Sequence, residues 1–501
     1  MSDALTPPPS PAFDDDYVTQ ALEYDESYTF DCKRIKGKLD SVLETVVAFA
    51  NSEGGTIALG LEDPDKASGR DRVFGIQENL MNWDEIRRLL RNRIIDPEDL
   101  PCQFKEIGCT LRDGARGSVV FLSVSKSRRI HSIVGNGTWV RFGKSNRQLT
   151  APEIVDLGFA RGTASAETLL EDIGFELLDT EFWRSYAARR RLTRPIDQAM
   201  FHLGLARKDD RGHLRPIRAA VLLFAEEPSG LLAGKASIRI FHYRGSRVAT
   251  DPNTNLLKQP ISINGPIIRQ IQLAHDQVVS ELASGIQKGP LGFEVVQDYP
   301  IRVINEAITN AVIHRDYRLN ADIHVRIFAD RIEVESPGLL IGPVTVGNIS
   351  RIGTYARNPH IVNHLREFPT PPNLDAGEGV RMMFGTMKEA GLYPPQYFTR
   401  PRIEREAVVV NLLNDHRPSI WEQVTDYLDR HGAIGNAEVR EIMGTPDTLA
   451  ATKKLRDWVN HGLLIVVNPS GAKQYRKYAR PDSESPGTLF SQLFGNQEDG
   501  K

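Results

Sequence analysis

The 501-residue sequence contains few cysteines, no long apolar run and almost no excess of charge. Its three cysteines, Cys32, Cys102 and Cys109, are too few and too irregularly spaced for a disulfide framework or a zinc site. No stretch stays apolar over the ~18 residues that a membrane helix needs. The first residues also lack the basic and apolar segments of a secretory signal. We therefore expect a cytoplasmic protein without a membrane segment.

The formal net charge is only −3, with 62 Lys and Arg against 65 Asp and Glu. Such a balance means that any nucleic-acid-binding surface must be a local patch of cations. At roughly 100–200 residues per domain, the length predicts three or four domains. Hydrophobic residues make up 40% and charged residues 25% of the chain, which is an ordinary globular composition.

Hydrophobic periodicity divides the chain into segments of different character. We expect the two ends to be disordered, because they are rich in proline or polar residues. The predicted fold class is α/β and α+β with several domains. The predicted segments are a disordered tail at 1–16, an α/β domain at 17–160, an α/β middle region at 161–290, a second α/β domain at 291–415, a helical module at 416–480 and a disordered tail at 481–501.

The same patterns predict individual elements within these domains. The predicted helices are 39–50, 83–94, 267–284, 300–314 and 381–390. The predicted strands are 56–61, 118–124, 138–142, 219–224, 236–243, 321–328 and 331–336.

The predicted helix 300–314 carries polar residues on an otherwise apolar surface. Glu306, Asn310 and His314 are four residues apart, so they share one face of the helix. An asparagine amide oxygen can hold Mg²⁺, and a glutamate can polarise an attacking water. A polar stripe that faces solvent explains the same spacing, and the helix alone does not separate the two interpretations.

Two glycine-containing segments follow this helix. Residues 336–338 (Ser-Pro-Gly) end a predicted strand, and residues 377–379 (Gly-Glu-Gly) precede a predicted helix. Backbone N–H groups at such glycines and at a helix N-terminus favour phosphate oxygens. No G-x-x-x-x-G-K-[ST] sequence occurs, so the site is not a P-loop.

The blocks NAVIHRDY, ESPGLL, RNPHIV and GEGVRMMFGTMKEAGLYPP follow one another between about 295 and 395. In that order they resemble the GHKL-type ATPase domain, a Bergerat-type α/β sandwich, in the divergent branch that accompanies Schlafen-type domains in bacteria. The resemblance implies ATP and Mg²⁺ as cofactors. Asn310 would hold the metal, Glu306 would activate water, and Gly377 and Gly379 would line the phosphate lid.

One departure from the better-known GHKL proteins concerns the base. Those proteins place an aspartate in D-x-G to bind the adenine amino group, whereas this chain has Ser336, Pro337 and Gly338. The resemblance therefore assigns Ser336 and Gly338 to the nucleotide site. A serine is an uncharged and weaker acceptor than a carboxylate.

The N-terminal segment ESYTFDCK (26–33), followed by AFANSEGGTIALGLED (48–63), resembles the Schlafen (AlbA-like) domain over about 20–160. In nucleolytic members, acids of these motifs form a metal site that cuts RNA. The resemblance thus implies that Glu26, Asp31 and Asp63 hold Mg²⁺ or Mn²⁺. Asp31 stands where the family usually has the longer glutamate.

The residues themselves allow this chemistry and an alternative. Asp31 and Lys33 are two apart, so a strand places them on one face, where the lysine can stabilise charge on a phosphate. Glu26 and Asp31 are five apart and need a bend or bulge to reach one metal. The alternative is a structural ion-pair cluster of these acids with Lys33.

A basic run without any Asp or Glu lies between residues 121 and 147. Its cations are Lys126, Arg128, Arg129, Arg141, Lys144 and Arg147. Cations bind phosphates, and the interleaved His131 or Trp139 can stack on a base. The alternatives are a solvated face for the cations and core packing for Trp139.

The C-terminal module reads as helices 419–430, 437–443 and 448–461, followed by a hairpin of 463–467 and 473–478. This order is typical of a winged helix. The third helix would offer Thr452, Lys453 and Arg456 to a major groove, and the wing would offer Lys473, Arg476 and Lys477 to phosphates. Protein contacts or dimerisation are the alternative, and we expect a homo-oligomer.

Together these patterns and resemblances predict a protein that binds ATP and nucleic acid. The first hypothesis is a Schlafen-type nuclease that cuts RNA of the tRNA kind under ATP control. The second is a non-catalytic, ATP-sensing, DNA-binding transcriptional regulator. The third is a hydrolysing ATPase that remodels nucleic acid. Resemblance alone implies a role in defence against phage or foreign DNA.

Overall fold

The computed structural model describes most of the chain in two compact units. One unit contains Met1–Leu157 with Pro418–Lys501, and the other contains Gly158–Arg417. The described residues are 12–232, 234–249, 254–282, 286–289, 292–295, 299–353, 355–372, 379–400, 402–415, 419–467 and 476–481.

The N-terminal part of the first unit is built on a four-stranded sheet of order β1-β2-β4-β3. The strands are β1 (Phe30–Lys33), β2 (Gly55–Leu59), β3 (Cys102–Thr110) and β4 (Arg116–Val124). β1 runs parallel to β2, and the other neighbours are antiparallel. The predicted strands at 56–61 and 118–124 are therefore confirmed.

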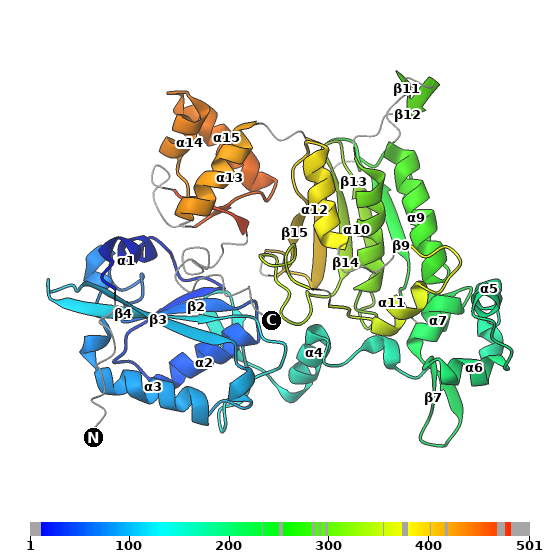
Figure 1. The fold of residues 1–501 in the computed structure, drawn as a ribbon, viewed down its shortest axis with the longest axis horizontal. Coiled ribbons are helices and arrows are strands. Elements are labelled where there is room, and N and C mark those ends of the chain that lie inside the picture. The colour runs from blue at the N-terminus through cyan, green and yellow to red at the C-terminus, as the bar shows by residue number, and fades with distance from the viewer. Residues whose placement is uncertain are drawn as a thin grey trace, which may run out of the picture. The chain divides into compact units, whose positions relative to one another are not determined.

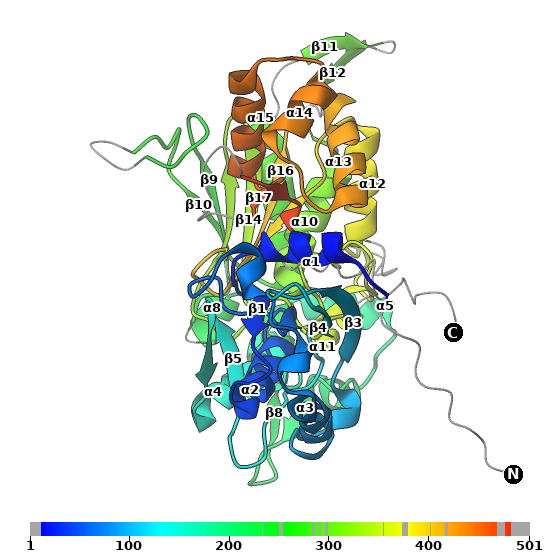
Figure 2. The same ribbon diagram turned by 90° about the vertical axis from the view of Figure 1, so that its left-hand side faces the viewer.

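Helices cover both faces of this sheet. On one side α2 (Leu39–Ala50) and α3 (Leu80–Asn92) pack against Ile57 and Leu122, and on the other side α1 (Asp15–Leu22) packs against Ala58 and Phe121. Figure 2 shows the sheet between these two helical layers. The buried residues alternate between the faces because successive strand side chains point to opposite sides. The helix predicted at 39–50 is confirmed at its exact bounds, and that predicted at 83–94 begins three residues earlier.

The rest of this part is a hairpin and connecting segments. The hairpin consists of β5 (Trp139–Phe142) and β6 (Ser145–Gln148), and α4 (Ala151–Arg161) follows it. Short 3-10 turns lie at Gly69–Arg72, Ile76–Glu78 and Pro97–Asp99.

The described residues of the C-terminal part form three helices and a two-stranded antiparallel sheet, in the predicted order. They are α13 (Ser419–His431), α14 (Asn436–Met443), α15 (Thr448–Asn460), β17 (Ile465–Val466) and β18 (Tyr478–Ala479). Trp421 and Trp458 meet in their core with ring centroids 5.1 Å apart. Asp447 caps the third helix by accepting hydrogen bonds from the Leu449 and Ala450 amides.

The second unit is built on a six-stranded sheet of order β10-β9-β13-β14-β16-β15. The strands are β9 (Ile238–His242), β10 (Ile261–Ile263), β13 (Ile323–Ile327), β14 (Arg331–Pro337), β15 (Gln396–Phe398) and β16 (Ala407–Leu413). β9 and β13 are parallel, and the other neighbours are antiparallel. The strands of this sheet come from both sides of residue 290, and so do the residues of its hydrophobic core. The predicted middle region (161–290) and the predicted second α/β domain (291–415) therefore share one sheet.

Three helices lie side by side over one face of this sheet (Figure 1). They are α9 (Ile267–Leu282), α10 (Ile301–Ile313) and α12 (Gly379–Glu389). α10 is the central helix and packs directly on β14. The predictions of helices at 267–284, 300–314 and 381–390 are confirmed to within two residues.

Smaller elements complete the second unit. The helices are α5 (Glu181–Arg189), α6 (Ile196–His202), α7 (Arg218–Phe224), α8 (Pro228–Leu231) and α11 (Pro359–Leu365). Two hairpins pair β7 (Ala206–Lys208) with β8 (Leu214–Pro216) and β11 (Ile286–Gly289) with β12 (Gly292–Val295), and 3-10 turns lie at Ala166–Thr168 and Phe175–Leu178.

The prediction of a strand at 219–224 is wrong, because these residues form α7. All six residues are buried, so the segment is apolar on every side. A short, continuously apolar run has no period that separates a buried strand from a buried helix. None of the helices in the described ranges combines the length and the apolar character needed to cross a membrane.

Candidate functional site

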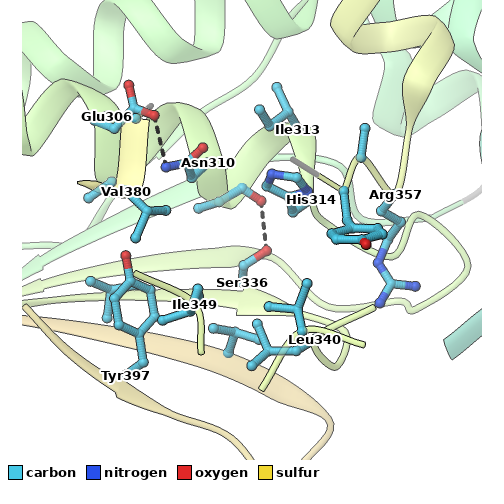
Figure 3. A pocket seen from close by; sticks show the side chains of 18 of the residues that line it. Glu306, Asn310, Ile313, His314, Ser336, Leu340, Ile349, Arg357, Val380 and Tyr397 are labelled. Atoms are coloured by element: carbon cyan, nitrogen blue, oxygen red, sulfur yellow. Dashed lines mark hydrogen bonds between the residues drawn. The ribbon is translucent and has the colours of Figure 1, made fainter. Parts of the chain in front are cut away.

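The second unit contains a cavity of about 410 Å³ between α10, the end of β14 and the start of α12 (Figure 3). Its lining includes Glu306, Asn310, His314, Ser336, Gly338 and Gly379. The structure therefore brings together most of the residues predicted for the nucleotide site. Gly377 is the exception, since it lies outside the described residues.

The polar face of α10 points into this cavity. The Asn310 amide nitrogen donates a hydrogen bond to Glu306 Oε1 at 3.0 Å, as the i, i+4 spacing allows. With its nitrogen engaged, Asn310 can offer its amide oxygen to a cation. The interpretation of this face as a solvent-exposed stripe is wrong.

The first residue of α12 lies directly against Glu306. A Cβ added at Gly379 would overlap Glu306 Oε1, so only glycine fits here without displacing the carboxylate. This close approach sets the Glu306 carboxylate at the N-terminal end of α12, where the helix dipole and free amides favour negative charge.

Ser336 and Gly338 shape the wall formed by the end of β14. The Ser336 hydroxyl donates to the Ala311 carbonyl at 2.6 Å, so its oxygen can act towards a ligand only as an acceptor. Gly338 has a φ of 115°, and a Cβ there would lie 2.9 Å from the Asp316 Cβ. Both the backbone conformation and the close approach require glycine at this position.

His314 and Arg357 lie at the same end of the cavity (Figure 3). Burial, and secondly the charge of Arg357, lower the pKa of His314 to about 4, so its imidazole is neutral at pH 7. Arg357 is buried and donates to the carbonyls of Phe159 and Leu339, and burial lowers the pKa of its guanidinium to about 10. Arg357 stands in the sequence block RNPHIV, but its sequence context does not reveal that it lines the cavity.

The remaining walls are apolar. Leu340, Ile349, Val380 and Tyr397 line the cavity, and burial raises the pKa of Tyr397, which keeps its phenol neutral. A mostly apolar cavity with a few converging polar groups is typical of a small-molecule site. These walls are not evident from the sequence, because apolar residues in helices and strands do not reveal whether they face a core or a cavity.

The N-terminal acids are arranged differently from the prediction. Asp31 is 1% exposed, and its two oxygens form ion pairs with Lys33 Nζ and Arg141 Nη1, both at 2.7 Å. A carboxylate held by two cations is part of a structural cluster, which is the alternative interpretation of these residues.

Glu26 and Asp63 line a separate hollow together with Lys33 and Glu62. Burial, and secondly the charge of Asp31, raise the pKa of Glu26 to about 7, although the Cys32 amide donates to it at 3.1 Å. Within the described ranges, no three His, Cys, Asp or Glu side chains are grouped to hold a metal ion. Of the three predicted metal ligands, Glu26 and Asp63 thus line one hollow, whereas Asp31 is held in ion pairs with Lys33 and Arg141.

The predicted basic run separates into buried and exposed cations. Lys126 is buried against Glu53 at 2.9 Å, and Arg141 is buried against Asp31, so neither can contact nucleic acid as predicted. Trp139 packs on the core and donates to the Asn136 carbonyl, which is its core-packing alternative. His131 is fully buried and cannot stack on a base.

Arg128, Arg129, Lys144 and Arg147 remain exposed. Three of them meet acids from outside the run: Arg129 pairs with Asp96 and Asp99, Lys144 with Asp65, and Arg147 with Glu153. The run lacks acids in sequence, but the fold supplies them, so the patch is weaker than its sequence suggests.

The C-terminal helix α15 exposes Thr452, Lys453 and Arg456. The Thr452 hydroxyl donates to the Thr448 carbonyl at 2.7 Å. Lys477 forms an ion pair with Glu438 at 3.1 Å, Arg476 is half-buried, and Lys473 lies outside the described residues. The helix therefore presents its predicted contact residues, whereas the wing is described only in part.

The chain thus contains a domain with a four-stranded sheet of parallel and antiparallel strands, and an α/β sandwich with a cavity large enough for a small-molecule ligand. Residues 26–150 match the family described as "Schlafen, AlbA_2", and residues 320–410 match HATPase_c_4, described as "Putative ATP-dependent DNA helicase recG C-terminal". The chain contains both domains, so the two resemblances predicted from the sequence are confirmed. The second match includes Ser336, Gly338 and Gly379 but begins after α10.

Among solved structures, the chain is similar to the DIP2311 protein from Corynebacterium diphtheriae. The two share 18% identity with a TM-score of 0.40, over 93% of this chain and 96% of that chain. A search of curated proteins finds no match.

Proposed function

We propose that the chain binds ATP in the cavity of its second unit and nucleic acid through its N-terminal and C-terminal domains, as an ATP-sensing regulator. The observation that carries the proposal is the cavity itself. It gathers Glu306, Asn310, Ser336, Gly338 and Gly379 around a space of about 410 Å³. The description of the HATPase_c_4 family, which names an ATP-dependent protein, supports the same ligand.

The donor set fits ATP with Mg²⁺. Asn310 would hold the metal through its amide oxygen, and a bound Mg²⁺ would neutralise phosphate charge. α12, an 11-residue helix that starts at Gly379, would direct its N-terminal amides to phosphate oxygens. The apolar walls of Leu340, Ile349 and Val380 suit the base, and Ser336 Oγ can accept from an adenine amino group.

Thermal unfolding of the full chain with and without ATP and Mg²⁺ tests this proposal. A ligand at about 100 times its Kd stabilises a protein by about 2.7 kcal/mol, so the melting temperature should rise with ATP. Asn310→Ala should abolish the rise. Asn363→Ala, which removes an exposed asparagine of α11 outside the cavity, should keep it. An equal rise in all three proteins would contradict the assignment of the site.

Two features outside the cavity, one in each terminal domain, support nucleic-acid binding. The N-terminal domain belongs to the Schlafen, AlbA_2 family, and the order of α13, α14, α15 and the β17–β18 pair is that of a winged helix. In such a module α15 would enter the major groove with Thr452, Lys453 and Arg456. Homo-oligomerisation and a role in phage defence remain predictions.

RNA cleavage is the second candidate function. Glu26 and Asp63 share a hollow, and a pKa of Glu26 near 7 is typical of a functional carboxyl group. The ion pairs of Asp31 argue against cleavage, because Lys33 and Arg141 occupy both of its oxygens. Incubation with tRNA and Mn²⁺, with and without ATP, separates the candidates. Cleavage that Asp63→Ala abolishes would favour the nuclease, and intact tRNA in every condition would favour the regulator.

A further inference from the structure

An exposed phenylalanine stands at the tip of the β5–β6 hairpin. Phe142 is 72% exposed and pairs with Ser145 across a turn formed by Gly143 and Lys144. Successive strand residues face opposite sides, so Phe142 points outward because its neighbour Arg141 points into the domain. The ring belongs to none of the hydrophobic core clusters of the described residues.

The hairpin that carries this ring is firmly anchored. The Arg141 amide donates to Ser52 Oγ at 2.8 Å, and its guanidinium donates to the Ser27 carbonyl at 2.9 Å. On the paired strand, the Asn146 amide nitrogen donates to Thr45 Oγ1 at 2.8 Å. A ring presented from such a rigid support loses little conformational entropy when it contacts a partner.

The same domain carries a basic segment that borders the hollow of Glu26 and Asp63. Residues 33–38 (KRIKGK) comprise the last residue of β1 and the connection to α2. Lys33, Arg34 and Lys36 line the hollow that also contains Lys66. The hairpin residue Lys144 forms an ion pair with Asp65 at 2.5 Å. The hydrogen bond to Asp65 and the Asp65 charge raise the pKa of Lys144, and the charges of Asp63 and Glu26, which line the hollow, add to this effect.

Two cations of this segment are uncompensated. Lys36 and Lys38 are exposed, and neither side chain has an ion-pair or hydrogen-bond partner among the residues that the structure describes. Of the acids that line the hollow, Glu62 pairs with other cations, namely Arg34 and Lys66. Lys36 and Lys38 are thus available to an anion.

An outward ring and two available lysines on the same domain match the chemistry of a nucleotide chain. Lysines bind phosphates, and an aromatic ring stacks on a base. A base in a duplex already stacks on both neighbours, so only an unpaired base offers its face to a side chain. The combination therefore favours a single strand over a duplex.

We propose that Phe142 stacks on an unpaired base of a single-stranded nucleic acid whose phosphates contact Lys36 and Lys38. This inference rests on the proposed function, namely that the N-terminal domain binds nucleic acid. It adds the substrate class, a single strand, and the residues that recognise it.

The test is fluorescence anisotropy of the full chain with labelled oligo(U) and oligo(dT), and with a duplex of the same length. Phe142→Ala should weaken single-strand binding about tenfold, and Phe142→Trp should retain it. Phe104→Ala is the matched control, because Phe104 is a 50% exposed phenylalanine of the same domain. The melting temperature of Phe142→Ala should equal that of the wild type.

Salt dependence separates stacking from phosphate contacts. Replacing both Lys36 and Lys38 with alanine should reduce the slope of log K against log salt by about 1.4, at about 0.7 for each lost phosphate contact. Phe142→Ala should leave the slope unchanged.

Three outcomes would overturn the inference. Equal single-strand affinity of wild type and Phe142→Ala would refute it and leave the proposed function intact. An equal loss for duplex and single strand would refute the substrate class. If the wild type binds no nucleic acid at all, the proposed function fails together with the inference.

Discussion

Gly379 shapes the proposed nucleotide cavity by its lack of a side chain. Its missing Cβ lets the start of α12 touch the Glu306 carboxylate. In Gly379→Ala the flexible Glu306 side chain must move away and lose its hydrogen bond to Asn310. We expect ATP affinity to fall about tenfold, which is about 1.4 kcal/mol, with little change in melting temperature. Isothermal titration with ATP and Mg²⁺ measures this loss.

Gly385 provides the control within the same helix. A Cβ added there meets no atom within 4 Å. Gly385→Ala should therefore leave ATP affinity unchanged and stabilise the helix by about 1 kcal/mol. Equal ATP affinities of Gly379→Ala and the wild type would show that the start of α12 takes no part in the site.

Arg141 shows how a predicted contact residue can have a structural role. It is buried against Asp31 and hydrogen bonds to the Ser27 carbonyl, so Arg141→Ala leaves a buried carboxylate with one fewer cation. We expect a loss of about 3 to 5 kcal/mol in the free energy of unfolding. Arg147→Ala, at the exposed pair with Glu153, should cost less than about 1 kcal/mol. Denaturant unfolding that gives similar losses for both would contradict this assignment.

Glu26 predicts a pH dependence of stability. Its pKa in the folded state is raised from 4.5 to about 7, so the folded state holds the proton more tightly than the unfolded state. The stabilisation is complete below about pH 4.5 and is lost as the pH rises to about 7. Relative to Glu26→Gln, the free energy of unfolding of the wild type should fall by about 1 to 2 kcal/mol over this range.

Urea unfolding at a series of pH values measures this difference. Glu23→Gln, which replaces an exposed glutamate of the same region, is the matched control. A difference between wild type and Glu26→Gln that stays constant with pH would contradict the burial of the Glu26 carboxyl group.

At the scale of elements, α15 carries the proposed contact with duplex DNA. Its exposed face presents Lys453 and Arg456, and its core residues Leu455 and Trp458 point inward. Replacing both Lys453 and Arg456 with alanine should weaken duplex binding and reduce the salt slope by about 1.8, at about 0.9 for each lost phosphate contact. Replacing Arg366, the exposed C-cap residue after α11, with alanine is the control. Unchanged duplex binding would favour the alternative of a protein-interaction module.

Amphipathic helices were predictable from the sequence, whereas polar strands and one apolar run were not. The bounds of α2 follow from its apolar face and the glycines after it, and α10 follows from its four-residue polar spacing. β3 was missed because several of its residues are exposed and polar, so it lacks a clear alternation. α7 was predicted as a strand because an apolar run buried on every side has no readable period.

The candidate cavity was more predictable than the nucleic-acid surface for a physical reason. Glu306 and Asn310 reveal their shared face through local helical spacing. Lys126 and Arg141 are neutralised by Glu53 and Asp31, which are distant in sequence and meet them only in the folded domain. A run of cations in a sequence therefore indicates a positive surface only if the acids that contact these cations in the fold are known.

At the scale of the whole molecule, occupation of the second unit's cavity by ATP is the central claim. Labelling of the full chain with photoreactive 8-azido-ATP and Mg²⁺, followed by peptide mapping, tests this claim most directly. The account predicts label on peptides that contain Leu340, Ile349 or Val380, and its loss in Asn310→Ala or with excess ATP. Label confined to other parts of the chain, or label that excess ATP does not remove, would contradict it.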